Sequence, residues 1–193
     1  MPPSPCIELG ESEQARLLEI ARRSISSGLA SGKTLQLDVT QLDASLQPAA
    51  AVFVTLTRGG ELRGCIGSLQ AQEPLAQAVT QAAFNAAFRD PRFPPLRADE
   101  LDAVRIEISV LSELEPIEAD TRQALLDSLR PGVDGLLLED GSYRSTFLPQ
   151  VWEKIASPAA FLEQLCLKAG LGAGHWSPTI RFHRYRTLSF SES

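Results

Sequence analysis

The fold is decided by residues 52–67, which read Val52-Phe53-Val54-Thr55-Leu56-Thr57-Arg58-Gly59-Gly60-Glu61-Leu62-Arg63-Gly64-Cys65-Ile66-Gly67. The run up to Thr57 is rich in β-branched and apolar residues, and a turn signal, Gly59-Gly60, follows it directly. This pattern predicts a strand, a tight turn and a returning strand. A hairpin of this kind is the basic unit of an antiparallel sheet.

The returning strand also carries the most distinctive chemistry in the chain. Glycine allows close backbone approach and positive φ, so the N–H groups beside Cys65 could form an anion-binding concavity. Arg63 offers a forked cation to a carboxylate or phosphate. We therefore name Cys65 as a candidate nucleophile and Arg63, Gly64 and Gly67 as candidate ligand-binding residues. The alternative is structural, because free cysteine is among the most buried residue types and Cys65 could simply fill the core.

A nearly all-apolar helix is predicted over residues 75–88, and an Arg- and Pro-rich segment follows it over residues 89–95. Within this segment Asp90 lies two positions before Arg92, which indicates an ordered ion pair. A segment that leaves a buried helix must return to the sheet, so we expect Asp90 and Arg92 to border one pocket with Arg63 and Cys65. The structural alternative is a loop clamp between helix and sheet, since such ion pairs are common and weak.

The remaining patterns mix helices and strands without a regular βαβ alternation. Apolar residues alternate over 104–110, Asp140-Gly141 predicts a second hairpin, and residues 180–190 read as a last strand. We therefore predict an α+β fold, with a largely antiparallel sheet and flanking helices. The expected organisation is one domain with a main lobe and a smaller inserted lobe, over residues 12–114 plus 179–193 and residues 115–178, respectively.

Composition excludes several classes of function. The chain has 18 basic and 24 acidic residues, a net charge of −6, which argues against sequence-independent nucleic-acid binding. No apolar stretch approaches the roughly 20 residues of a membrane span, and no secretory signal opens the sequence. Cys6, Cys65 and Cys166 are too few for a disulfide framework, so we expect free thiols in a cytoplasmic protein.

No cofactor or metal site is predicted. The sequence has no phosphate-cradling glycine motif, and no cysteine and histidine spacing typical of a metal site. His175 and His183 are the only histidines, and neither is near Cys65 in sequence, so no base can be assigned to that thiol.

The sequence resembles the AMMECR domain family, also called AmmeMemoRadiSam system protein A. The resemblance runs from about residue 12 onward and is carried by blocks at Val52–Leu56, Leu62–Gly67, Ala86–Phe93, Ile106–Val110, Arg130–Leu136, Leu148–Val151 and Cys166–Leu171. It implies a two-lobed α+β fold. It also implies a partner role beside a Memo-type protein and a radical S-adenosylmethionine enzyme.

Two functions are compatible with these observations. The first is a binding module, in which the pocket around Leu62–Gly67 receives an anionic small molecule or a partner peptide. The second is a cysteine-dependent enzyme or thiol carrier with Cys65 as the nucleophile. Reactivity of Cys65 in the native protein separates them, and the sequence alone leaves open whether the chain is an enzyme.

Overall fold

The computed structural model describes residues 8–192, which divide into two compact units. The larger unit contains residues 8–111 and 188–192, and the smaller unit contains residues 112–187. Each unit holds one four-stranded sheet with its own helices, which confirms the α+β prediction. Within the described residues, no helix is both long and apolar enough to cross a membrane.

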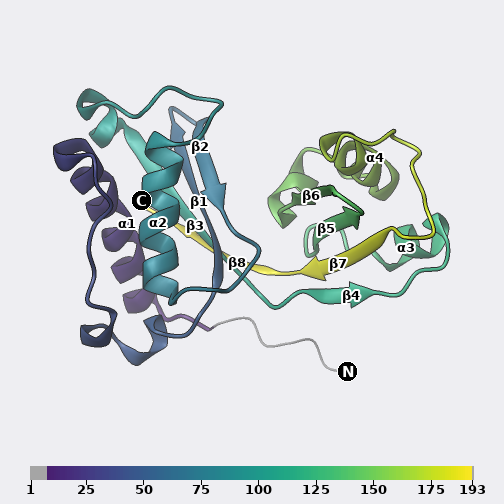
Figure 1. Cartoon of the computed structure of the whole chain (residues 1–193), viewed down its shortest axis with the longest axis horizontal. Coiled ribbons are helices and arrows are strands. Elements are labelled where there is room, and N and C mark those ends of the chain that lie inside the picture. Colours follow the sequence, from purple (N-terminus) through teal and green to yellow (C-terminus); the bar gives the residue numbers. More distant parts are fainter. Residues whose placement is uncertain (1–7, 193) are drawn as a thin grey trace. The chain divides into compact units, whose positions relative to one another are not determined.

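The sheet of the larger unit has the strand order β2-β1-β3-β8 (Figure 1). Its strands are β1 (Ala51–Arg58), β2 (Glu61–Gly67), β3 (Val104–Leu111) and β8 (Thr187–Ser191). The predicted hairpin is confirmed, because β1 pairs with β2 in antiparallel register across a turn at Gly59 and Gly60, both with positive φ. β2, which carries the cysteine, lies at the edge of the sheet.

Two helices pack together and cover one face of this sheet (Figure 1). They are α1 (Glu11–Ser31) and α2 (Leu75–Phe88); three short 3₁₀ helices complete the unit, η1 (Val39–Gln41), η2 (Ala44–Leu46) and η3 (Ala98–Ala103). The apolar residues of β1 and β3 that face these helices are buried. Gly28 lies inside α1, three residues before the end of the helix. A Cβ at Gly28 would lie 2.2 Å from the ring of Phe88, so this glycine allows close contact between the helices.

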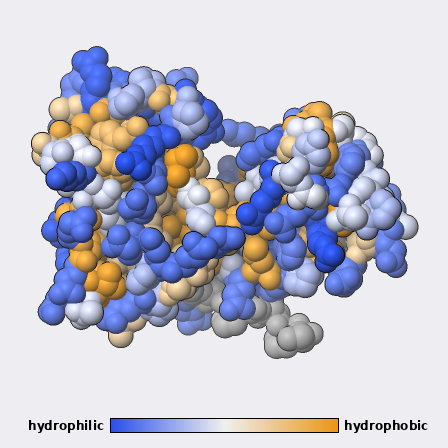
Figure 2. All heavy atoms as spheres, viewed as in Figure 1, coloured by the Kyte–Doolittle hydropathy of each residue, from blue (hydrophilic) through white to orange (hydrophobic). Residues whose placement is uncertain are grey.

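The smaller unit has the strand order β4-β7-β5-β6. Its elements are β4 (Glu115–Ile117), α3 (Arg122–Ser128), β5 (Gly135–Asp140), β6 (Tyr143–Phe147), η4 (Pro149–Glu153), α4 (Pro158–Lys168) and β7 (Arg181–Tyr185). The hairpin predicted at Asp140-Gly141 joins β5 to β6. In the core, Trp152 stacks on Phe161 with ring centroids 3.8 Å apart, and the indole N–H donates to the carbonyl oxygen of Asp134. In Figure 2 hydrophilic residues predominate on the visible face of each unit.

The single strand predicted over 180–190 is two strands in two different sheets. β7 pairs with β4 and β5 in the smaller unit, whereas β8 belongs to the sheet of the larger unit. Between them, the backbone of Arg186 bonds to Ser112 in both directions: its carbonyl accepts from the Ser112 N–H, and its N–H donates to the Ser112 hydroxyl, each at 2.9 Å. The smaller unit therefore extends to residue 187 instead of 178, since an unbroken strand pattern does not show where a chain changes sheets.

Candidate functional site

The backbone of Cys65 is held on the open edge of β2. Residues of an edge strand alternately direct their N–H and C=O groups toward the neighbouring strand and away from it. Those of Cys65 point away from β1: its N–H donates to Asp90 Oδ2 at 2.9 Å, and its carbonyl accepts from Arg92 Nη2 at 3.2 Å. The segment after α2 therefore binds the strand edge at the cysteine. The N–H does not form an open anion-binding concavity, because a carboxylate of the chain itself already accepts from it.

Asp90 is the centre of this clamp. Asp90 is 4% exposed. Its carboxylate accepts hydrogen bonds from the backbone N–H, Nε and Nη2 of Arg92, in addition to the Cys65 N–H. The hydrogen bonds from the Arg92 side chain, and further ones from the Cys65 and Arg92 backbone, hold the pKa of Asp90 well below its usual range. Asp90 is therefore a permanent anion at neutral pH, with both oxygens occupied.

The thiol of Cys65 lies on the sheet face opposite α1 and α2. The neighbouring Ile66 packs into the helix-covered core, and side chains alternate along a strand. Thr55 on β1 is directly opposite both Cys65 and, on its other side, Glu107 of β3. The Thr55 hydroxyl donates to Cys65 Sγ at 3.2 Å. Thiol, hydroxyl and carboxylate thus form one cross-strand row, and Cys65 is half-buried.

The two glycines that flank the cysteine are required for packing. A Cβ at Gly64 would lie 2.2 Å from the carbonyl oxygen of Ala86 in α2, and a Cβ at Gly67 would lie 2.2 Å from that of Val52. Neither glycine has a positive φ. These glycines therefore permit a close approach, as the sequence argument expected, but the group that approaches is the chain's own backbone.

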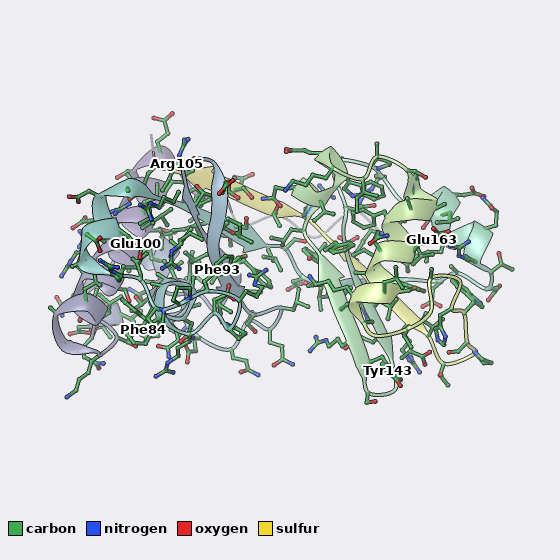
Figure 3. All side chains as sticks on the ribbon, turned by 90° about the horizontal axis from the view of Figure 1, so that it is seen from above. Phe84, Phe93, Glu100, Arg105, Tyr143 and Glu163 are labelled. Carbon is green, nitrogen blue, oxygen red and sulfur yellow. The ribbon has the colours of Figure 1, made fainter. Side chains whose placement is uncertain are left out.

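Arg63 belongs to a different set of contacts, which defines the basic hollow. This surface depression of about 360 Å³ is lined by Arg58, Arg63, Pro94, Pro95, Arg97, Asp99 and Glu100. Glu100, labelled in Figure 3, accepts a forked pair of hydrogen bonds from Arg63 at 2.9 and 3.0 Å, and one from Arg58 at 3.2 Å. The hydrogen bonds of Arg63, followed by that of the Arg97 backbone N–H, lower the pKa of Glu100 to about 2.

The structure thus brings three of the predicted site residues into direct contact, namely Cys65, Asp90 and Arg92. Arg63 instead pairs with Glu100, a residue that the sequence reasoning missed. One signal could have indicated it: Glu100 follows Arg97 by three positions at the start of a short helix, the spacing of a residue that caps the helix by accepting from the Arg97 N–H. The role of Thr55 could not have been derived from the turn at Gly59-Gly60, because the strand register shifts by one residue between Leu56 and Thr57, and the turn alone would have placed Val54 opposite Cys65.

The histidines lie in the smaller unit and have acidic partners there. His175 Nε2 is 2.7 Å from Asp140 Oδ2, and His183 Nδ1 is 3.7 Å from Glu139. Cys65 and Cys166 form no disulfide bond within residues 8–192, and Cys166 is buried; Cys6 lies outside the described residues. Among residues 8–192, no group of three or more cysteine, histidine or acidic side chains could hold a metal ion.

Comparison with known proteins assigns the chain to a family. The chain is 40% identical over 186 residues to a protein of Methanothermobacter thermautotrophicus, covering 95% of this chain and 96% of that protein. It is 38% identical to protein SSO0193 of Saccharolobus solfataricus, covering 96% and 84%. The crystal structure of the uncharacterised protein PH0010 from Pyrococcus horikoshii matches with a TM-score of 0.86 and 34% identity, covering 92% of this chain and 90% of that one. The pattern that defines the AMMECR1 family matches residues 18–190, and the chain belongs to this family.

Proposed function

We propose that this protein is a binding protein, and that the basic hollow beside Leu62–Gly67 receives an anionic group. The supporting observation is that a single carboxylate, Glu100, serves two arginines. Arg58 and Arg63 both pair with it, whereas Arg97 pairs with Asp99. The lining residues therefore carry three positive and two negative charges, an excess of +1 in a chain whose net charge is −6.

The arginines of the hollow differ in how available they are. Arg63 is largely buried, with 12% of its side chain exposed, and its forked pairing with Glu100 fixes its position. Arg58 and Arg97 have side chains that are 55% and 76% exposed, so their guanidinium groups remain in contact with solvent. Exposed ion pairs exchange partners at little cost. An incoming anion would therefore bind Arg58 and Arg97, while Arg63 and Glu100 form the fixed floor.

The residues that we assign to this role differ from those that the sequence predicted. Asp90 has both oxygens occupied, and its partner Arg92 is neutralised by it. Both are better explained as positioning residues for β2 than as direct ligands. From the family resemblance we further propose that the protein acts beside a Memo-type protein and a radical S-adenosylmethionine enzyme, either of which could present the anionic group.

The proposal is tested by titrating the protein with inorganic phosphate at constant ionic strength and recording the NMR signals of the arginine side chains. Arg58→Gln and Arg97→Gln should each weaken binding about tenfold, which corresponds to about 1.4 kcal/mol for a charge-assisted hydrogen bond. Arg16→Gln is the matched control, because Arg16 is an exposed arginine of α1 whose side chain pairs with an acidic neighbour. Equal weakening in all three variants, or no saturable binding, would refute a defined anion site.

One observation favours a second function, thiol chemistry at Cys65. The Thr55 hydroxyl donates to Sγ, and a hydrogen bond to sulfur stabilises the thiolate. The thiol would act as a nucleophile or carrier, with Glu107 next in the cross-strand row. Iodoacetamide treatment of the native protein tests this function, with buried Cys166 as the internal control. Rapid alkylation of Cys65 below pH 8 supports it, and alkylation of both cysteines only after unfolding excludes it.

A further inference from the structure

The two carboxylates that line the basic hollow differ in how many hydrogen bonds they accept. Both oxygens of Glu100 are occupied. Its Oε1 accepts from Arg58 and Arg63, and its Oε2 accepts a second bond from Arg63. Oε2 also accepts from the backbone N–H of Arg97. Asp99 instead accepts one side-chain hydrogen bond among residues 8–192, from Arg97 Nη2 to its Oδ2 at 3.1 Å. Its Oδ1 is therefore available to a new donor.

Asp99 is also the carboxylate that a ligand can reach. Its side chain is 66% exposed, whereas that of Glu100 is 10% exposed. The two arginines that we assign to the anion, Arg58 and Arg97, are exposed as well. A ligand in the basic hollow therefore meets two accessible cations and one accessible carboxylate, and it displaces no buried group.

An anion that binds Arg97 disturbs the pairing of Asp99. If the anion takes the place of the carboxylate at Nη2, Asp99 loses its partner. If it binds the other N–H groups of the guanidinium, two like charges lie side by side. A positive group on the ligand offsets the penalty in either arrangement, because it can donate to Asp99. A ligand with a cation close to its anion thus suits this lining better than an anion alone.

The charge of the lining indicates which acid such a ligand has. Three arginines and two carboxylates leave an excess of one positive charge. A phosphate monoester carries close to −2 at neutral pH, so with one ammonium group its net charge is about −1, which neutralises the lining. An α-amino acid has no net charge and leaves the excess in place. A phosphate without an amine overcompensates it.

The rest of the lining suits a short carbon chain between the two charged groups. Pro94 and Pro95 are exposed and have no backbone N–H, so they present ring surface and offer an acid no donor. The volume of about 360 Å³ lies near the lower end of the roughly 300–1,000 Å³ of small-molecule sites. The hollow therefore favours a small ligand with few carbon atoms.

We propose that the basic hollow binds a small phosphate monoester that carries an amine. Its phosphate contacts Arg58 and Arg97, and its ammonium group donates to Asp99. This inference rests on the anion site proposed above and adds the class of ligand. Lipid headgroups contain the same two groups, but their phosphate is a diester with about one negative charge less, which leaves the lining unbalanced. We therefore assign the site to the free monoester.

The test titrates the full chain with aminoethyl phosphate and with ethyl phosphate, which lacks only the amine. At about pH 8 both phosphates are dianions and the amine is protonated. Binding is followed by carbon-detected NMR of the guanidinium groups of Arg58 and Arg97 at constant ionic strength. We expect aminoethyl phosphate to bind about threefold more tightly, which is the size of one exposed ion pair. Glycerophosphoethanolamine, the diester, should bind more weakly than aminoethyl phosphate, and equal binding would overturn the assignment to a monoester.

Two variants identify the contact. Asp99→Asn should abolish the preference for aminoethyl phosphate and tighten the binding of ethyl phosphate, because a like charge is removed. Asp102→Asn is the matched control: Asp102 is an exposed acid of the same 3₁₀ helix outside the lining, so the variant changes the net charge equally and should keep the preference.

The outcomes separate this inference from the anion site on which it rests. Equal affinities of the two phosphates for the wild type, or a preference that Asp99→Asn leaves in place, would overturn the amine-bearing ligand and leave the anion site standing. Absence of saturable binding by either phosphate would refute the anion site and this inference with it.

Discussion

Replacing Asp90 by asparagine tests whether the clamp at Cys65 stabilises the larger unit. The wild-type carboxylate accepts four hydrogen bonds, from the Cys65 N–H at 2.9 Å and from three Arg92 donors at 2.7 to 3.1 Å. Asparagine has the same shape but no charge, and its –NH₂ group would face donors on one side. At least one of the four hydrogen bonds is lost, and the remaining ones no longer have a charged acceptor.

The expected loss of stability in Asp90→Asn depends on which of the former hydrogen-bond donors water can reach. The side chain of Arg92 is 53% exposed, so its guanidinium is rehydrated, and loss of its ion pair costs only about 1 kcal/mol. The Cys65 N–H faces a carboxylate that is 2% exposed, and an unsatisfied donor there costs about 1–3 kcal/mol. We therefore expect Asp90→Asn to lower the free energy of unfolding of the larger unit by about 3 kcal/mol.

Urea unfolding provides the assay with an internal control. Both tryptophans, Trp152 and Trp176, lie in the smaller unit, so fluorescence reports that unit, whereas circular dichroism reports both. Asp90→Asn should shift the dichroism transition and leave the fluorescence transition in place. Arg92→Gln should cost about 1 kcal/mol or less, because it removes the exposed partner. Stability of Asp90→Asn within about 0.5 kcal/mol of wild type, or a larger loss in Arg92→Gln, would refute the clamp.

Three further predictions follow from the same edge of the sheet. Gly64→Ala should destabilise the larger unit by about 3 kcal/mol, because its Cβ would lie 2.2 Å from a carbonyl oxygen of α2, whereas Gly174→Ala, where a Cβ meets nothing within 4 Å, should be nearly neutral in urea unfolding. The hydrogen bonds from Arg63 lower the pKa of Glu100 from its ordinary 4.5 to about 2, so the stability that Glu100 contributes is present above pH 4.5 and is lost as the pH falls toward 2; an acid titration of Glu100→Gln should show a smaller loss over this range, and an unchanged profile would contradict the ion pair. Cys65→Ser should be about 1 kcal/mol more stable than Cys65→Ala, because the serine oxygen can still accept from the hydroxyl on β1, and the reverse order of melting temperatures would show that this hydrogen bond has no net value.

The elements that could be predicted from sequence are those set by local patterns. The β1–β2 hairpin, the helix over 75–88 and the alternating strand at 104–110 each have a periodicity that a short window contains. The Asp90–Arg92 pair was also predictable, because its members lie two positions apart on either side of Pro91.

What could not be predicted depends on contacts between distant segments. Arg63 was interpreted as free for a ligand, but Glu100, 37 positions away, satisfies two of its donors. The glycines around Cys65 indicated a backbone that a ligand could reach. In the structure, Gly64 is required instead because α2 approaches β2 too closely there to leave room for a side chain.

The arrangement of β8 has a consequence for how the chain folds during synthesis. All of the smaller unit precedes β8 in the sequence, so a ribosome completes residues 112–187 before it makes the strand that finishes the sheet of the larger unit. Until then the outer edge of β3 has no neighbour, and Arg22 lacks Glu192, its acidic partner at the far end of the chain. The unit that begins first is therefore the last to close, and a nascent chain stalled before residue 187 exposes an unpaired strand at which other chains can aggregate.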